Sequence, residues 1–302
     1  TFGVLVGCFQ WVYRKRPVTG SAAAAMRPYQ KAISPFRGWV FGGIPALLGI
    51  VIGGSLAANW QRVLMWINGT SFGEVDPQFG IDISFYVFTV PVLEIIVSFL
   101  MGLAVMSLVT VVALNYLYGG IAFTPRPLAT RPARMQMGVI AAIISLLIGT
   151  RYWLGIYSML YQQNSEQVDG ALYRDINAGL PAQAILAVIS VLVAGLFLFA
   201  AFRGAWRLPA TGVAVTVVSA LVIGLAYPAL IQQFRVAPNA RSLEQPYIQR
   251  NIDATLKAYG LDEVDYQRYS AKTDVAPGQL RDDSESTSQI RLLDPAIVAP
   301  TF

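Results

Sequence analysis

The stretch DPQFGIDISFYVFTVPVLEIIVSFLMGLAVMSLVTVVAL, residues 76–114, decides the fold of this chain. Its first half is polar and aromatic and is closed by Pro91, whereas its second half, Ile95 to Leu114, holds twenty residues without a charge. At about 1.5 Å of rise per residue, a helix of that length covers the ~30 Å hydrocarbon core of a bilayer. The stretch therefore predicts a membrane-spanning helix that is entered from a structured polar segment.

The composition of the whole chain indicates the same class. Hydrophobic residues make up 55% of the 302 residues and charged residues only 13%, whereas soluble domains carry about 25% charged residues. Histidine is absent, which excludes histidine-based zinc sites and Ser-His-Asp catalysis. The single cysteine, Cys8, can form no disulfide within the chain. Because no nucleotide-binding, hydrolase or metalloprotease motif occurs, we expect no catalytic residue, no metal ligand and no cofactor.

Apolar runs divide the chain into a membrane domain, residues 1–231, and a tail. The apolar segment 1–13 is too short to span a bilayer alone, so we interpret it as the end of a helix whose start is missing. Five complete spans are predicted at 39–58, 91–118, 137–160, 181–202 and 209–231. Residues 232–302 are interpreted as the start of a truncated extracytoplasmic domain. The expected fold class is an all-α membrane protein, a polytopic transmembrane helix bundle with an extracytoplasmic C-terminal segment.

Acidic residues are absent from every second connection. The connections 14–37, 119–136 and 203–208 carry six, three and two Lys or Arg and no Asp or Glu. Basic short loops stay in the cytoplasm, so we expect these three to be cytoplasmic and 59–90, 161–180 and 232–302 to be extracytoplasmic, in a bacterial plasma membrane. All six tryptophans fall near predicted span ends, as an interfacial belt requires. The net charge of +5 is thus a topology signal, and we expect no nucleic-acid partner.

The tail contains one helical pattern, SLEQPYIQRNIDATLKAYG at 242–260. Ile248, Ile252, Leu256 and Tyr259 recur at helical spacing, and Gly260 provides a stop. The pattern predicts one amphipathic helix of about four turns. Because its polar face mixes both signs of charge, we expect the apolar face to pack within the extracytoplasmic domain, with the membrane surface as the alternative.

Glu94 and Arg151 are the only charged residues inside the predicted spans. Burying either charge near the bilayer centre would cost about 2.5–3.5 kcal/mol. Both are expected near the extracytoplasmic side, where they could form an ion pair or bind a charged ligand or lipid head group. The alternative is that each side chain reaches the interface separately.

The segment that leads into the predicted span 91–118 is a second candidate site. We expect a joint between the membrane and the outer domain, formed by Asp76, Pro77, Phe79, Asp82, Phe85, Tyr86, Phe88 and Pro91. Its aromatic rings suit the head-group level, and Pro91 can begin a helix without leaving a donor unused. Glu74, Asp76 and Asp82 bring three carboxylates together, but their spacing matches no calcium loop. A structural role in turns is therefore favoured over a metal site.

Two small-residue patterns permit close approach between helices. They are Gly49-xxx-Gly53 and Ala220-xxx-Gly224. Such patterns are frequent in apolar helices, so we interpret them as internal packing and not as a dimer interface.

Four longer sequence segments resemble those of a known protein family. They are FGEVDPQFGIDISFYVFTVP at 72–91, DINAGLPA at 175–182, EQPYIQRNIDATLKAYGLD at 244–262 and IRLLDPAIVAPTF at 290–302. Together they resemble uncharacterised protein family 0182, large integral membrane proteins of actinobacteria that also occur in cyanobacteria and some other bacteria. The resemblance covers the chain in order. It implies amino-terminal transmembrane helices followed by a large extracytoplasmic domain, most of which this chain would lack, and it implies no activity and no catalytic residues.

Three functions are compatible with these observations. The preferred one is a non-enzymatic scaffold or accessory subunit of a cell-envelope or membrane complex, with membrane lipids and proteins as partners. The second is a transporter or lipid-handling protein with an outward-facing pocket near Glu94 and Arg151, which the lack of polar residues through the midplane disfavours. The third is an envelope enzyme whose active site lies in the missing domain, and nothing in the sequence excludes it.

Overall fold

The structure is a computed structural model, and it describes residues 1–15, 26–36, 38–122, 128–162, 170–204, 207–265, 267–269 and 277–282. The described part is almost wholly helical, as predicted. Its only strands are β1 (Ile121–Ala122) and β2 (Leu128–Ala129), which form a two-residue antiparallel ladder.

Within the described ranges, five helical segments are long and apolar enough to cross a membrane, which indicates a membrane protein. Their bounds are Trp39–Ala57, Phe85–Leu117, Arg131–Ser158, Asp175–Arg203 and Leu208–Ala258. Their principal helices are α4 (Ile44–Ala57), α6 (Val90–Leu117), α7 (Arg131–Ser158), α8 (Leu180–Arg203), α9 (Arg207–Ser219) and α10 (Tyr227–Ile231). A shorter helix, α1 (Phe2–Arg14), precedes them.

A proline follows each of five π-helical turns. The turns are η2 (Trp39–Gly43), η3 (Phe85–Thr89), η4 (Asp175–Gly179), η5 (Ala220–Ala226) and η6 (Gln232–Val236). Proline lacks an N–H, and its ring clashes with the carbonyl four residues earlier. The preceding turn widens, so that the N–H of Val90 donates to the carbonyl of Phe85, five residues back. Pro91 and Pro181 therefore do not begin their helices as predicted, because the helical backbone already starts at Phe85 and Asp175.

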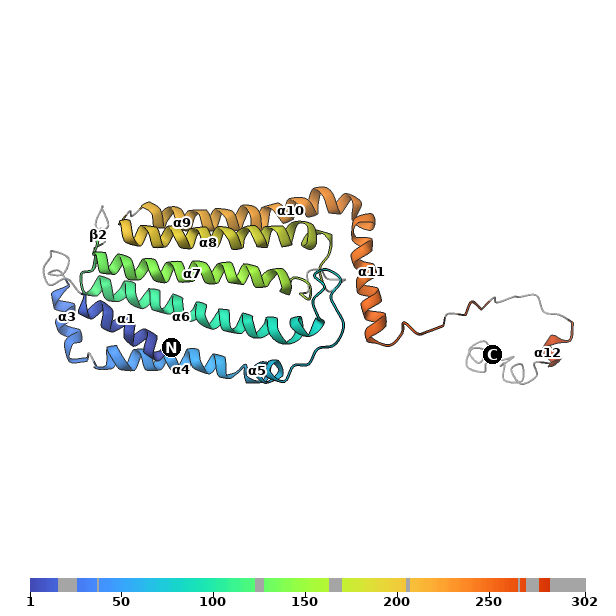
Figure 1. Cartoon of the computed structure of the whole chain (residues 1–302), viewed down its shortest axis with the longest axis horizontal. Helices are drawn as coiled ribbons and strands as arrows, with labels where there is room; N and C mark the ends of the chain where they lie inside the picture. Colours follow the sequence, from blue (N-terminus) through green and yellow to red (C-terminus); the bar gives the residue numbers. More distant parts are fainter. Residues whose placement is uncertain are drawn as a thin grey trace, which may run out of the picture. The chain divides into compact units, whose positions relative to one another are not determined.

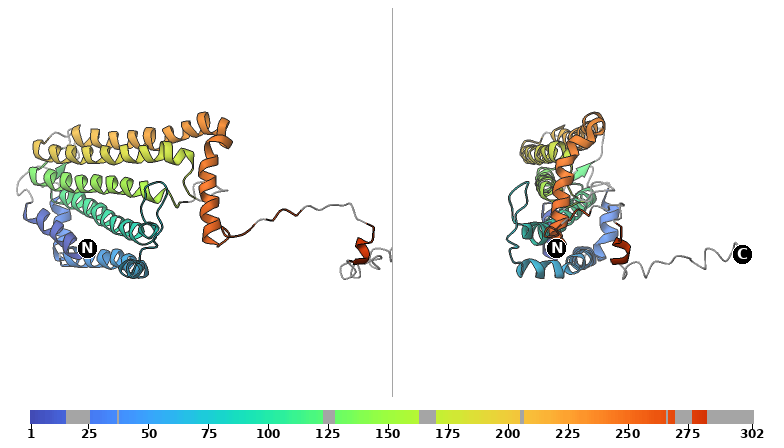
Figure 2. Two further views of the ribbon diagram at one scale, coloured as in Figure 1. Left: turned by 45° about the vertical axis from the view of Figure 1, so that its right-hand side comes forward. Right: turned by 90° about the vertical axis from the view of Figure 1, so that its right-hand side faces the viewer.

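Helices α6, α7, α8 and α9 run alongside one another in alternating directions (Figure 1; Figure 2). The closest seam joins α7 and α8, where small residues face each other. The hydroxyl of Ser145 donates a hydrogen bond of 2.8 Å to the carbonyl of Ser190. A Cβ added at Gly138 would stand 2.5 Å from the Cβ of Ala201. The glycine therefore lets the two backbones approach, as small residues do in membrane helix pairs.

The two small-residue patterns noted in the sequence contribute less. Gly49 lies near Phe2 of α1, and Gly224 faces Leu186 of α8, both within this chain. A Cβ added at Gly53 would meet no atom within 4 Å. The seam between α7 and α8 was not among the patterns identified in the sequence.

Burial falls from the centre of the bundle to its edges. The buried share of the most apolar 18 residues differs from span to span. This share is 39% in Asp175–Arg203, 6% in Trp39–Ala57 and zero in Leu208–Ala258. The two poorly buried spans lie at opposite edges of the bundle (Figure 1). A helix that is apolar all round needs lipid or protein around it, so these edges are surfaces for lipid or for a partner.

The described acidic residues of the bundle lie toward one of its two ends, where arginines such as Arg174 accompany them. At one end, here called the basic end, α7 begins and α6 and α8 finish, and Arg131, Arg134 and Arg203 lie there. At the other, the acidic end, α7 finishes and the helices containing α6 and α8 begin, next to Asp82 and Asp175. The alternation of charged loops in the sequence thus corresponds to two physical ends, and the compartment that each end faces stays a prediction.

Two short helices lie in segments expected to be connections. Helix α3 (Arg27–Ile33) is tied to the end of α6 by Gln30, whose Nε2 donates a 2.9 Å hydrogen bond to the carbonyl of Leu117. Helix α5 (Trp60–Ile67) follows α4 and exposes Trp60 and Trp66. An exposed amphipathic helix with tryptophans at a span end suits the membrane interface.

The helix predicted in the tail is present as α11 (Ala240–Ala258), and Gly260 follows it at a φ of +64°. No loop precedes it, because helical turns continue from α10 through η6 and η7 (Ala237–Asn239). None of its residues is buried, so its amphipathic packing stays a prediction. The chain forms two compact units, 1–253 and 254–302, and the second includes α12 (Gln279–Asp282).

Candidate functional site

Asp82 organises the segment that leads into α6. Its carboxylate accepts hydrogen bonds from the hydroxyl of Ser71 and from the N–H groups of Gly73 and Ser84, at 3.1 and 2.8 Å for the last two. The hydrogen bonds from Ser71 and Ser84 hold the pKa of Asp82 well below its ordinary range, because they favour the charged form. Gly73 adopts a φ of +73°, which favours glycine at this turn.

Asp76 closes the turn that follows. Its Oδ2 accepts hydrogen bonds from the N–H groups of Gln78 and Phe79, at 3.1 and 2.6 Å, and from the hydroxyl of Tyr86 at 3.3 Å. Both aspartates therefore accept hydrogen bonds from their own segment, which is the structural role that the sequence favoured. Among the described residues, no three acidic or cysteine side chains group closely enough to hold a metal ion.

The aromatic side chains of this segment pack on α7. The rings of Phe79, Phe85 and Tyr86 lie 5.5, 5.4 and 6.5 Å from the ring of Tyr157, centroid to centroid. Phe88 instead meets Phe72 at 5.6 Å. The expected joint residues thus fall into two groups, and Tyr157, near the end of α7, holds the larger one together. Sequence reasoning missed Tyr157 because it is one tyrosine among fourteen.

Glu94 and Arg151 line one cavity at the acidic end. The cavity has a volume of about 620 Å³ and lies among α6, α7 and α8. By helical rise, Glu94 is about 6 Å beyond the start of α6 and Arg151 about 10 Å before the end of α7, so the two charges share a level. The only ion pair in the described part joins Arg174 and Asp175. Glu94 and Arg151 are thus brought to one cavity without neutralising each other directly.

Gln183 of α8 completes this cavity, and the sequence did not single it out. Its Oε1 atom is buried and has no hydrogen-bond partner among the described residues. The amide lies against Gly155 of α7, where an added Cβ would stand 2.6 Å from that oxygen. Tyr152 and Gln183 also line a neighbouring cavity of about 470 Å³ that contains the Arg174–Asp175 pair. Two polar cavities therefore lie side by side at this level.

Tyr161, in the segment after α7, senses the charge of Glu94. The pKa of Tyr161 is raised to about 12, chiefly by burial and next by the charge of Glu94, while Arg62 of α5 opposes the shift. Glu94 therefore lies within electrostatic reach of the segment that follows α7. Opposite charges with amide and hydroxyl groups suit a zwitterionic ligand, and about 620 Å³ lies within the ~300–1,000 Å³ of ordinary ligand pockets.

The first part of α11 is attached to the acidic end. Tyr247 accepts a 3.1 Å hydrogen bond from the side-chain amide of Asn177, and its ring lies 6.2 Å from that of Tyr173. Arg250 donates a 3.5 Å hydrogen bond to the side chain of Gln78, beside Pro77. Tyr247, Arg250 and Gln78 line a third cavity, of about 340 Å³, which also contains Asp76. Three segments far apart in sequence thus meet in what we call the three-way joint: residues 76–79, 170–177 and 247–251.

The fold and these sites define a class: a polytopic helical membrane protein with polar cavities and a folded joint at one end of its bundle. Within that class, the chain belongs to the Uncharacterised protein family (UPF0182), whose sequence profile matches residues 1–302. This confirms the family that the four sequence segments indicated.

Relatives in the same family come from actinobacteria. A UPF0182 protein of Leifsonia xyli subsp. xyli is 44% identical over 295 residues, which cover 97% of this chain and 30% of the relative. A UPF0182 protein of Tropheryma whipplei is 40% identical over 305 residues, 99% of this chain and 32% of the relative. The chain thus spans about a third of the length of these relatives. No solved structure matches it.

Proposed function

We propose that this chain is the membrane platform of a larger cell-envelope protein, acting as a non-enzymatic scaffold or accessory subunit. The observation that carries the proposal is the three-way joint. The chain leaves the last span through α10 and is at once tied down by Tyr247 and Arg250. A platform needs such a fixed exit, because an outer domain on a free linker would move independently of the membrane domain.

The platform is proposed to lie in a bacterial plasma membrane with its basic end in the cytoplasm, in accordance with the positive-inside rule. Cysteine labelling in intact cells tests this orientation. In a Cys8→Ser background, Asn68→Cys at the acidic end should react with a membrane-impermeant maleimide, and Lys31→Cys at the basic end should react only after lysis. The reverse labelling pattern would refute the orientation.

The partner side of the proposal is tested by site-specific photo-crosslinking in the full-length protein. A crosslinking residue is placed at Ile50 on α4 or at Leu225 at the opposite edge, both exposed and apolar, with the buried Val111 as control. A scaffold predicts a discrete protein adduct from one of the two edges and none from Val111. Lipid adducts alone from both edges, together with purification as a solitary monomer, would rule out the scaffold.

The second candidate function is a lipid-handling or transport role, and the cavity of Glu94 and Arg151 favours it. The two charges face one space without an ion pair, and the Oε1 of Gln183 lacks a partner. Native mass spectrometry with phosphatidylethanolamine as the probe tests this role. Glu94→Gln and Arg151→Gln should each lower retention of the lipid, and Lys31→Gln at the opposite end should not. Equal retention by all three variants would exclude the cavity as the lipid site.

A further inference from the structure

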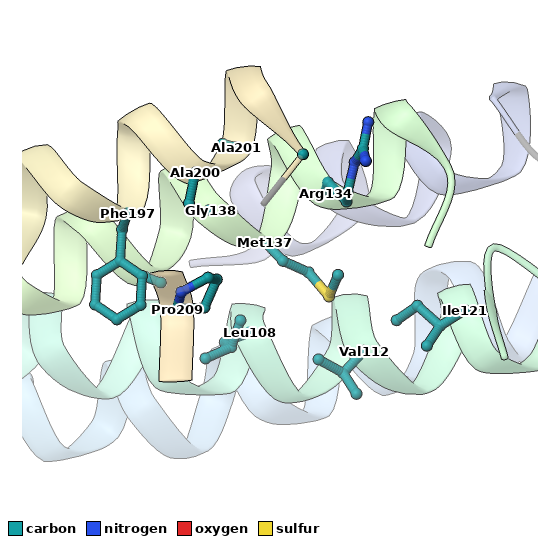
Figure 3. A pocket seen from close by; sticks show the side chains of 12 residues that line it. Leu108, Val112, Ile121, Arg134, Met137, Gly138, Phe197, Ala200, Ala201 and Pro209 are labelled. Atoms are coloured by element: carbon teal, nitrogen blue, oxygen red, sulfur yellow. The ribbon is translucent and has the colours of Figure 1, made fainter. Parts of the chain in front are cut away.

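We propose that the basic end of the bundle holds an anionic phospholipid, with one acyl chain in a cavity among α6, α7, α8 and α9 and the phosphate on Arg134. The cavity has a volume of about 290 Å³, near the lower limit of ~300 Å³ for ligand pockets. Its lining includes Leu108, Met137, Phe197 and Pro209 (Figure 3), and Arg134 is its one charged residue. This site is separate from the proposed function and lies at the other end of the bundle from Glu94.

The position of Arg134 and its hydrogen bonding suit the binding of an anion. It lies one turn before Met137 on α7, at the end of the apolar space in Figure 3. Its Nε atom is buried and has no hydrogen-bond partner among the described residues. A buried donor without a partner is costly, and a phosphate oxygen would satisfy it through a charge-assisted hydrogen bond.

The start of α7 adds a second argument. Its first turn contains no acidic residue, and Thr130, the N-cap, makes no side-chain capping bond. A helix N-terminus favours negative charge, yet here Arg131 and Arg134 place two cations at it. A phosphate bound at Arg134 would complement this helix N-terminus, whereas Arg131 is exposed and does not line the cavity.

An alternative partner for Arg134 is the end of α8. The guanidinium lies against Gly204, the C-cap of α8, where an added Cβ would be in contact with Nη1. The dipole at a helix C-terminus favours a cation, but this contact leaves Nε without an acceptor. The α8 terminus is thus adjacent to the guanidinium, and the Nε donor of Arg134 is still available to a ligand.

The lining selects the ligand class. A free phosphate would use Arg134 but leave the apolar space empty, whereas a phospholipid fills both. A zwitterionic lipid would bring a cation to a cavity whose one charged lining residue is Arg134 and which no carboxylate lines. Basic pockets between membrane helices bind anionic lipid head groups in this way. The chemistry does not depend on which leaflet contains the basic end.

The test is a titration of the full chain, freed of lipid in detergent, with phosphatidylglycerol, followed by native mass spectrometry. Arg134→Gln should weaken binding about tenfold or more, because it removes the charge and its hydrogen bonds. Arg131→Gln is the matched control: it removes an exposed arginine three residues away on the same helix and should change binding less than about threefold. Arg134→Lys keeps the charge and should retain most of the binding.

A second variant tests the acyl-chain half of the site. Ala141→Leu fills part of the cavity while leaving Arg134 unchanged, so it should weaken phosphatidylglycerol binding without any loss of charge. It also keeps the test decisive if Arg134→Gln fails to fold. Phosphatidylcholine with the same acyl chains, and inorganic phosphate alone, should bind at least tenfold more weakly than phosphatidylglycerol. Equal effects of Arg134→Gln and Arg131→Gln, no effect of Ala141→Leu, or equal binding of phosphatidylcholine or inorganic phosphate would overturn the proposal.

Discussion

Replacing Gly138 by alanine should destabilise the bundle, although alanine is the better helix former. The new Cβ would lie 2.5 Å from the Cβ of Ala201 and 3.2 Å from the carbonyl oxygen of Phe197. Carbon atoms in contact normally stand about 3.5–4.0 Å apart, so α7 and α8 must separate locally by about 1 Å. Neither neighbour is the end of a flexible side chain, and the strain therefore reaches both backbones.

The size of the effect follows from two opposing contributions. Overpacking a close contact costs about 1–3 kcal/mol, whereas alanine in place of glycine in a helix returns up to about 1 kcal/mol. The net expectation is a loss of about 1 kcal/mol in the free energy of unfolding. Gly195 on α8 is the matched control, because a Cβ there meets no atom within 4 Å. Gly195→Ala should therefore be neutral or stabilising, which is the opposite sign.

The assay is unfolding by SDS in mixed detergent micelles, followed by circular dichroism. A double-mutant cycle sharpens it: Gly138→Ala combined with Ala201→Gly moves one methyl group across the seam and relieves the contact. The two changes should therefore couple favourably by about 1–2 kcal/mol. Equal shifts for Gly138→Ala and Gly195→Ala, or strictly additive changes in the cycle, would refute the packing argument.

Two further predictions concern the acidic end. Because hydrogen bonds lower the pKa of Asp82 in the folded chain, its charge stabilises the fold above the unfolded pKa of about 3.9, and this contribution is lost as the pH falls through the lower folded pKa. Asp82→Asn should accordingly lower the thermal midpoint at pH 6 and lower it less below about pH 3.5; the same difference at both pH values would contradict the assignment. Tyr157→Leu removes ring contacts with Phe79, Phe85 and Tyr86, each worth about 0.5–1.5 kcal/mol. It should cost about 1–3 kcal/mol by the same SDS assay, and an effect no larger than that of Tyr259→Leu, an exposed control, would show that the ring cluster is not a structural support.

The layout of the spans was predictable because each depends on local composition. A run such as 95–114 must be a helix wherever it meets lipid, since only a helix satisfies every backbone group there. The ends of the spans were less predictable. Pro91 and Pro181 indicate helix starts by the usual rule, but a π-helical turn before each proline carries the helix six residues further out. A proline is compatible with a helix start and also with a widened turn that ends two residues earlier, so the residue type alone does not separate the two.

The candidate sites were predictable in part. Helical rise along the chain puts Glu94 and Arg151 at one level, and both line the same cavity. Gln183 could not be added from the sequence, because its position depends on the register between α8 and α7. That register is set by the contacts of Gly149 and Gly138 with α8, and a pattern within one helix does not reveal its neighbour.

The sequence by itself determined that this is a helical membrane protein with several long apolar helices, because hydrophobicity acts residue by residue along the chain. Only the tertiary structure decided which small residues meet, where the cavities lie and which polar atoms lack a partner. The stretch of residues 76–114 illustrates this difference between sequence and tertiary structure. Its apolar half is a span by composition alone, whereas its polar half becomes a joint only because Tyr157 and the first part of α11 pack against it. Contacts between distant segments depend on the packing of whole helices, and no single stretch of the chain encodes them.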